Sequence, residues 1–130
     1  MSVRIVVAGA LIEDSALLVA QRARPAELAG FWELPGGKAA AGESDAEALA
    51  RELREELGID VIVGDRLGAD VALTESMVLR AYLVQRTGGE VRPIDHRDLR
   101  WVSAAELAAL PWVPADRAWI PALQRALRQR

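Results

Sequence analysis

The segment that most constrains this chain runs from Gly37 to Ile59 and reads GKAAAGESDAEALARELREELGI. Its second half predicts a helix that begins at Ser44, because a serine followed three residues later by Glu47 forms a capping-box pattern. Gly58 suits the position just beyond the helix, where the left-handed backbone conformation is favourable mainly for glycine. Leucines recur at every fourth position and predict an apolar face that packs against the rest of the protein: Leu49, Leu53 and Leu57.

The same predicted helix carries three carboxylates, Glu52, Glu55 and Glu56. Residues three and four apart are neighbours on a helix surface, so these charges repel one another unless a positive group lies between them. Oxygen ligands of this kind suit a hard divalent cation such as Mg²⁺. The alternative is a solvated face laced by ion pairs, since Arg51 and Glu55 stand four residues apart. The three carboxylates by themselves leave both interpretations open.

The pattern of glycine, acidic and arginine residues extends well beyond these three positions. Gly37, Glu43 and Arg51 are separated by five and then seven residues, and the stretch ELREELGI completes the pattern. This arrangement resembles the Nudix box of the Nudix hydrolases, and the preceding GFWELPGGK resembles their MutT-type branch. The resemblance covers nearly the whole chain. It implies an α/β Nudix fold, an α/β/α sandwich with a mixed β-sheet between helices, and hydrolysis of a nucleoside diphosphate linked to a further group.

The length and composition set the class of protein that we expect. A chain of 130 residues predicts one domain, 1–130, and 52% hydrophobic with 27% charged residues is typical of a soluble globular protein. The net charge of −3 argues against stable nucleic-acid binding. The absence of cysteine is compatible with a cytoplasmic location, and no apolar stretch is long enough to span a membrane. Monomer and homodimer both remain open.

The remaining pattern predicts short strands with helices between them, as a mixed α/β domain requires. Strands are expected at residues 3–12, 16–21, 31–34, 61–67, 71–73, 77–86 and 99–102. Ser103 with Glu106 predicts a second capped helix that ends near Pro111. A last helix is expected from Arg117 to the C-terminus, with Pro121 straining its first turns.

The resemblance also implies a metal site and its neighbours. Gly36 and Gly37 form a turn at which the backbone can approach a ligand closely. By resemblance, Mg²⁺, or Mn²⁺ in its place, is held by the Gly36 carbonyl and three carboxylates: Glu52, Glu55 and Glu56. Glu52 and Glu55 are also expected to act in catalysis, and Arg51 to orient Glu55.

Asp95 stands where MutT-type proteins tend to have a glutamate that completes the catalytic site. Because aspartate is one methylene shorter, a water-mediated role or general-base assistance is as plausible as direct metal ligation. The alternative is a loop aspartate in a turn with Arg97. The neighbouring His96 could assist protonation or read the base, although a partly exposed structural histidine is the favoured interpretation.

Three further residues are candidates for substrate binding. Arg22 lies where MutT relatives place an arginine towards the substrate phosphates, and a guanidinium fork suits phosphate oxygens. Arg24 is a weaker candidate, and a surface charge is the alternative for both arginines. Glu33 either braces the glycine turn or accepts a hydrogen bond from the nucleotide.

Base recognition is expected near the C-terminus. The segment WVPADRAWIPAL resembles the base-reading segment of MutT-like triphosphate pyrophosphohydrolases and assigns that role to Asp116, whose alternative role is a helix N-cap. Trp32 or Tyr82 could stack on the base, with core packing favoured for each. The chain most resembles actinobacterial MutT-like proteins that act on dCTP-type pyrimidines, with CTP and 5-methyl-dCTP included and 8-oxo-dGTP as the main alternative.

The expected reaction converts a nucleoside triphosphate to the monophosphate and pyrophosphate, which would remove modified or excess nucleotides. Hydrolysis of ADP-ribose or dinucleoside polyphosphates is disfavoured, because the usual proline or tyrosine marker is missing from the stretch Leu73–Ser76. A non-catalytic Nudix ligand-binding regulator is a third interpretation. It is disfavoured because such proteins usually lose carboxylates of the Nudix box, whereas this chain keeps all four of them: Glu43, Glu52, Glu55 and Glu56.

Overall fold

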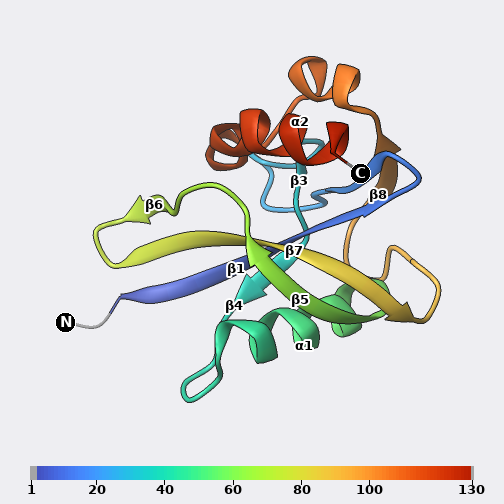
Figure 1. Cartoon of the computed structure of the whole chain (residues 1–130). Helices are drawn as coiled ribbons and strands as arrows, with labels where there is room; N and C mark the ends of the chain where they lie inside the picture. Colours follow the sequence, from blue (N-terminus) through green and yellow to red (C-terminus); the bar gives the residue numbers. More distant parts are fainter. Residues whose placement is uncertain (1–2, 130) are drawn as a thin grey trace.

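A mixed β-sheet built around its first strand organises the computed structural model, which describes residues 3–129. The strands β3, β2, β1, β7 and β5 follow one another across the sheet (Figure 1). Three shorter strands extend it, β4 beside β1, β6 beside β7 and β8 beside β2. The bounds are β1 (Arg4–Glu13), β2 (Ala16–Gln21), β3 (Trp32–Glu33), β4 (Gly36–Lys38), β5 (Asp60–Arg66), β6 (Val71–Thr74), β7 (Met77–Gly88) and β8 (Asp98–Val102).

The central strand β1 pairs with different partners along its length. It runs parallel to β7 from Arg4 to Leu11, while its Val6–Ala8 segment pairs with antiparallel β4 on the other side. Only its last residues, Ile12 and Glu13, pair with β2. The sheet therefore opens between β1 and β2, and the glycine segment of β4 fills part of that opening.

The two faces of the sheet are covered by different helices (Figure 1). On β1, Val7 and Leu11 point towards helix α1 (Asp45–Leu57), where they pack with its leucines. Ala8 and Ala10 belong to the core on the opposite face. There the cover is α2 (Ile120–Arg128) with two 3₁₀ helices, η1 (Ala104–Ala109) and η2 (Pro114–Trp119). The expected α/β/α layers are therefore present.

The ends of α1 are formed as the sequence predicts. The Ser44 hydroxyl accepts a hydrogen bond from the Glu47 backbone N–H at 3.1 Å, and the Glu47 carboxylate accepts one from the Ser44 N–H at 2.9 Å. Gly58 ends the helix with φ of 72°. The carboxylate stripe of the helix is therefore fixed in position relative to the sheet.

The glycine turn predicted at Gly36 and Gly37 is in fact strand β4. Gly36 pairs with Ala8, and a Cβ at Gly36 would lie 1.9 Å from the backbone oxygen of Val7. A side chain is thus excluded by the close pairing with β1 rather than by a turn conformation. The consequence is that the Gly36 backbone is held rigidly beside α1.

The C-terminal helices also differ from the prediction. Arg117 lies in η2, and α2 begins only at Ile120. Pro121 therefore stands in the first turn of α2, where an N–H would have no helical partner, so it causes no kink. The segment after Ser103 is a 3₁₀ helix, with the Glu106 carboxylate accepting from the Ser103 N–H as expected. Within residues 3–129 no helix has the length and apolar character needed to cross a membrane.

Candidate functional site

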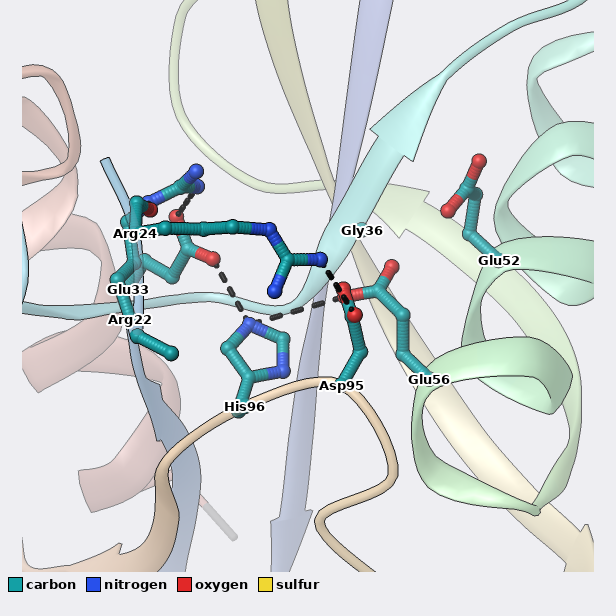
Figure 2. Close-up of a pocket in the computed structure, with 9 residues that line it drawn as sticks. Arg22, Arg24, Glu33, Gly36, Glu52, Glu56, Asp95 and His96 are labelled. Carbon is teal, nitrogen blue, oxygen red and sulfur yellow. Dashed lines mark hydrogen bonds and ion pairs between the residues drawn. The ribbon is translucent and has the colours of Figure 1, made fainter.

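A polar cleft of about 200 Å³ opens between β2, β4, α1 and the loop before β8 (Figure 2). It gathers residues that are far apart in the sequence, including Gly36, Glu52 and Asp95. Its lining comprises Arg22, Ala23, Arg24, Glu33, Gly36, Glu52, Glu56, Asp95 and His96. Most of the site residues predicted from the sequence therefore meet here, whereas Arg51, Glu55 and Asp116 lie outside this lining.

Glu56 is the buried carboxyl group of the cleft. The residue is only 7% exposed, and its Oε2 atom has no hydrogen-bond partner within residues 3–129. Burial raises the pKa of Glu56 to about 9, and the nearby carboxylates of Glu52, Glu33 and Asp95 add to the shift. Without a cation beside it, this group is therefore a neutral acid at pH 7.

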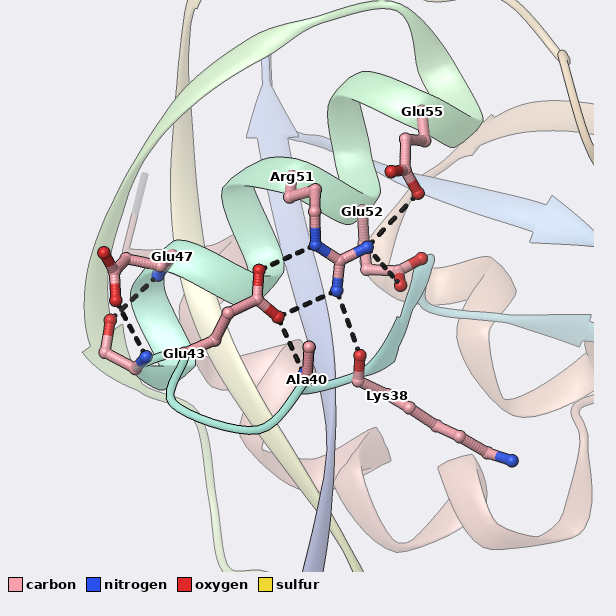
Figure 3. Close-up of polar contacts among 8 residues, drawn as sticks. Lys38, Ala40, Glu43, Glu47, Arg51, Glu52 and Glu55 are labelled. Atoms are coloured by element: carbon pink, nitrogen blue, oxygen red, sulfur yellow. Dashed lines mark hydrogen bonds and ion pairs between the residues drawn. The ribbon is translucent and has the colours of Figure 1, made fainter.

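Arg51 is the positive group between the carboxylates of α1 (Figure 3). Its Nη1 donates to Glu52 Oε1 at 3.0 Å and to Glu55 Oε2 at 3.2 Å. It also binds both oxygens of Glu43, at 2.7 and 2.9 Å, and the Lys38 carbonyl at 3.1 Å. Hydrogen bonds from Arg51 lower the pKa of the Glu43 carboxyl to about 2. The expected contact between Arg51 and Glu55 is present, and Arg51 fixes Glu52 as well.

Glu55 points away from the cleft. Its side chain is 60% exposed and forms the i,i+4 ion pair with Arg51 that the sequence offers as the alternative. Across the described residues, no group of three acidic or histidine side chains converges as a ready-made metal site. In this arrangement Arg51 holds two of the carboxylates that the resemblance assigns to a metal.

The donor atoms around the cleft nevertheless fit a hard divalent cation. The carboxylates and the Gly36 carbonyl offer oxygen ligands, and within residues 3–129 the buried Oε2 of Glu56 has no hydrogen-bond partner. Space for the Glu52 carboxyl depends on Gly37, because a Cβ at that position would lie 2.4 Å from the Glu52 carboxyl carbon. A cation bound there would neutralise the charges that raise the pKa of Glu56.

His96 bridges two carboxylates across the floor of the cleft. Its Nε2 lies 2.9 Å from Glu33 Oε2 and 3.7 Å from Glu56 Oε1, and its side chain is only 5% exposed. The residue as a whole is partly exposed, as expected, while its imidazole is buried against these carboxylates. The Ile94 N–H binds the Glu56 carbonyl and the Arg97 N–H binds the Gln21 carbonyl, so the loop is anchored on both sides with His96 beneath it.

The arginines of the cleft differ in their partners. Arg22 donates from Nη1 to Glu33 Oε1 and from Nε to the Arg24 carbonyl, each at 3.0 Å. Arg24 donates from Nη2 to Asp95 Oδ1 at 3.0 Å. The expected turn partner of Asp95, Arg97, is therefore not the one it binds.

A second cleft of about 320 Å³ adjoins the first and is mostly apolar. The two clefts share Arg22, Glu33 and Gly36. Its other lining side chains include Leu28, Leu34, Leu73, Leu79, Val113, Ala115 and Asp116. A polar chamber and an apolar chamber with a common wall can accept a ligand that is charged at one end and flat and apolar at the other.

Asp116 lies in the wall of the apolar cleft and is 4% exposed. Its Oδ2 accepts a hydrogen bond from the Leu34 N–H at 2.8 Å. Burial raises the pKa of Asp116 to about 7, against the opposing effect of that hydrogen bond. The N-cap alternative was wrong, because Val113 occupies the N-cap of η2 and the Asp116 carboxyl binds the strand connection instead.

The aromatic candidates for base stacking are used elsewhere. Trp32 is 7% exposed and lies in the core on the α2 side of the sheet. The Tyr82 hydroxyl donates to Asp45 Oδ2 at 2.5 Å, which ties β7 to the start of α1. Core packing, the favoured use of each, is what the structure shows.

Comparison with known proteins decides the family. The sequence model described as NUDIX domain matches residues 3–123, nearly all of the chain. The chain belongs to the Nudix family. It is a Nudix nucleotide pyrophosphohydrolase of the MutT type, an assignment that its relatives support.

Two relatives align with this Nudix hydrolase along most of their length. "Putative 8-oxo-dGTP diphosphatase 2" of Mycobacterium tuberculosis is 61% identical over 127 residues, which cover 95% of this chain and 90% of the relative. CTP pyrophosphohydrolase of Escherichia coli is 37% identical over 127 residues, 96% of this chain and 92% of the relative. The solution structure of the E. coli ORF135 protein has a TM-score of 0.82 and 35% identity, covering 98% of this chain and 92% of that one.

Sequence reasoning about this Nudix hydrolase missed the apolar cleft. Its walls come from segments that are far apart in the sequence, and leucines such as Leu28 and Leu79 give no local signal that distinguishes a cleft from a core. One weak signal was available. Leu73 lies in β6 next to Thr74, and it is 38% exposed.

Proposed function

We propose that this protein is a Mg²⁺-dependent pyrophosphohydrolase of cytosine nucleoside triphosphates. The substrates are dCTP, 5-methyl-dCTP and CTP, and the products are the monophosphate and pyrophosphate. The observation that carries the proposal is the pair of adjoining clefts that share Arg22, Glu33 and Gly36. The polar cleft takes the triphosphate and the apolar cleft takes the base, so the protein would remove modified or excess cytosine nucleotides from the nucleotide pool.

The metal is assigned to the carboxylate side of the polar cleft. Its proposed ligands are Glu52, Glu55, Glu56 and the Gly36 carbonyl, and Mn²⁺ can replace Mg²⁺. Use of Glu55 requires its exposed side chain to leave Arg51. When bound, the cation neutralises phosphate charge and lowers the pKa of a bound water.

The remaining side chains orient the reactants. Phosphoryl transfer requires mainly positioning and stabilisation of charge on the phosphate oxygens. Arg22, braced by Glu33, faces both clefts and is proposed to bind phosphate at their junction. Glu52 from α1 and Asp95 from the loop before β8 both line the polar cleft and are the proposed groups to accept the proton of the attacking water.

The base assignment rests on the state of Asp116. A neutral carboxyl group offers one O–H donor and an acceptor, which matches cytosine N3 and the N4 amino group. Of the four ionisable side chains that line the apolar cleft, Arg22 and Glu33 also line the polar cleft and Lys38 is exposed, which leaves Asp116 as the buried candidate. An oxidised guanine has more polar edge groups, and those left unpaired beside leucine and valine side chains would weaken its binding.

The second candidate substrate is 8-oxo-dGTP. One specific observation favours it, the name of the 61% identical relative of M. tuberculosis. The name of the E. coli relative, which is less similar, favours CTP instead. Substrate competition is therefore the decisive measurement.

The test is kcat/KM for dCTP, 5-methyl-dCTP, CTP, 8-oxo-dGTP and dGTP, with pyrophosphate and phosphate release measured separately. We expect the cytosine nucleotides to lead and pyrophosphate to be the product. Asp116→Ala should lower kcat/KM for dCTP by about 10- to 100-fold, since a buried hydrogen-bonding partner of the base is lost. A higher kcat/KM for 8-oxo-dGTP than for dCTP would replace the first candidate with the second.

A matched variant separates reading of the base from structural support. Asp116→Asn keeps an acceptor for the Leu34 N–H and supplies an N–H donor in place of the acid O–H. We expect it to retain the preference for cytosine that Asp116→Ala loses. If Asp116→Ala keeps the order of substrates, Asp116 only fastens Leu34 and does not read the base.

A further inference from the structure

The ion pair between Arg24 and Asp95 joins two loops across the polar cleft. Arg24 follows β2 and Asp95 precedes β8, and both line the cleft with Glu56 and His96. Figure 2 shows the Arg24 side chain extended across the cleft to Asp95, with their polar atoms 3.0 Å apart. Anything that enters the cleft as far as Glu56 therefore meets this pair.

Arg24 is held far less firmly than Arg22. The Arg22 side chain is 33% exposed and uses its guanidinium on both Glu33 and the Arg24 carbonyl. The Arg24 side chain is 73% exposed, and within residues 3–129 Asp95 is the single hydrogen-bond partner of its guanidinium. A guanidinium has five N–H donors, so most of those on Arg24 are available to a ligand.

The pair can be opened at little cost. Asp95 is itself 53% exposed, and ion pairs between exposed side chains contribute little to stability. A triphosphate carries several charges, and its paired oxygens can accept two hydrogen bonds from the planar guanidinium of Arg24. Such a bidentate, charge-assisted contact is stronger than the single hydrogen bond to Asp95. A phosphate close to Arg24 would also repel the Asp95 carboxylate.

We propose that Arg24 is a phosphate-binding residue that exchanges partners when the substrate enters. Its guanidinium leaves Asp95 and binds the triphosphate, and the freed Asp95 carboxylate turns towards Glu56 and the reacting water. Asp95 is thereby paired with Arg24 before the substrate binds and is available to the reacting water afterwards. The inference rests on the proposed triphosphate substrate but not on which base that substrate carries.

Calorimetric binding of inorganic tripolyphosphate with Mg²⁺ tests the exchange without any base. Arg24→Gln should weaken binding by about 10-fold, as expected for loss of a charged hydrogen bond. Asp95→Asn should strengthen binding by about 2- to 5-fold, because the competing partner of Arg24 is removed at a cost set by an exposed pair. Arg97→Gln is the control, since Arg97 lies in the same loop outside the cleft lining, and its binding should be unchanged.

The exchange is tested by the directions in which Arg24→Gln and Asp95→Asn change the binding of tripolyphosphate. A purely structural tie between the loops predicts that Arg24→Gln and Asp95→Asn weaken binding alike, and that result would overturn the exchange. Unchanged binding in Arg24→Gln would also overturn it. In the double variant the gain from Asp95→Asn should disappear. Repeating the series with the α,β-methylene analogues of dCTP and dGTP separates failure of the exchange from failure of the base assignment.

Discussion

Glu56 and Asp116 are both buried carboxyl groups, yet they differ in what surrounds them. Glu56 lies among other carboxylates in the polar cleft, and its Oε2 has no hydrogen-bond partner in the part of the chain that the structure describes. Asp116 lies among leucine and valine side chains and accepts a hydrogen bond from the Leu34 N–H. Both have a raised pKa, about 9 and about 7, mainly because burial disfavours the charged form.

The difference lies in what a bound ligand would change. Neighbouring charges add to the shift at Glu56, and a divalent cation would cancel them and favour the ionised form. A nucleotide base in the apolar cleft would bury Asp116 further and favour the neutral form. A raised pKa therefore has opposite consequences for the two proposed roles: a metal ligand has to lose its proton, whereas a base-reading acid has to keep it.

Replacing Glu56 and Asp116 by the corresponding neutral amides gives the largest expected difference in activity. Glu56→Gln should lower kcat by about 10³-fold, because an amide cannot supply the negative charge that holds a cation. Asp116→Asn should stay within about 10-fold of the wild-type kcat/KM for dCTP, since an amide reproduces a donor and an acceptor. The measurement is steady-state kinetics with Mg²⁺ near pH 7.

Glu52→Gln removes a second proposed metal ligand and serves as the reference. Its kcat should fall as that of Glu56→Gln does. Folding is monitored by urea unfolding, in which all three variants should remain cooperative. Wild-type turnover in Glu56→Gln, or collapse of activity in Asp116→Asn, would reverse the assignment of the two acids.

The stability of the protein against pH provides the second contrast. The pKa of Asp116 is about 7 in the folded protein and 3.8 is its ordinary value, so the neutral form stabilises the fold fully below about pH 4. That contribution, up to about 4 kcal/mol, is lost as the pH rises to about 7. Asp116→Asn has no titrating group at this position and should lose none of this contribution. The free energy of unfolding of the variant should therefore rise relative to that of the wild type between about pH 4 and about pH 7.

Urea unfolding of both proteins at intervals from pH 4 to 8, without divalent metal, measures this difference. Asp98→Asn is a suitable control because Asp98 is exposed and binds only its neighbour's N–H. Parallel stability curves for the wild type and Asp116→Asn would mean that Asp116 is ionised in the folded protein.

The two acids also show how far the sequence alone could go. The spacing around Glu56 and the ends of its helix were predictable, because Ser44, Glu47 and Gly58 act through neighbours on the same helix. The environment of Asp116 was not, since its partner Leu34 is 82 residues away. The contact of His96 with Glu33 was not predictable for the same reason, since the two residues are 63 positions apart. Local chemistry fixes a helix and its carboxylates, whereas the surroundings of a buried polar group depend on pairing across the whole sheet.

Proton release on metal binding is the smallest of the three contrasts. Because the pKa of Glu56 is about 9 without metal, binding of Mg²⁺ near pH 7 has to expel about one proton. The apparent affinity for Mg²⁺ should then fall by about 10-fold, or 1.4 kcal/mol, for each unit of pH below 9. Asp116→Asn should follow the wild type, since no cation is expected beside that residue.

Calorimetric titration of Mg²⁺ in buffers of different ionisation enthalpy counts the protons released. Glu56→Gln should bind Mg²⁺ more weakly and release none of them, and its affinity should no longer follow pH with this slope. Release of a proton that persists in Glu56→Gln and disappears in Asp116→Asn would place the cation beside the apolar cleft. Binding without any release in the wild type would mean that the metal leaves Glu56 protonated and relies on Glu52, Glu55 and the Gly36 carbonyl.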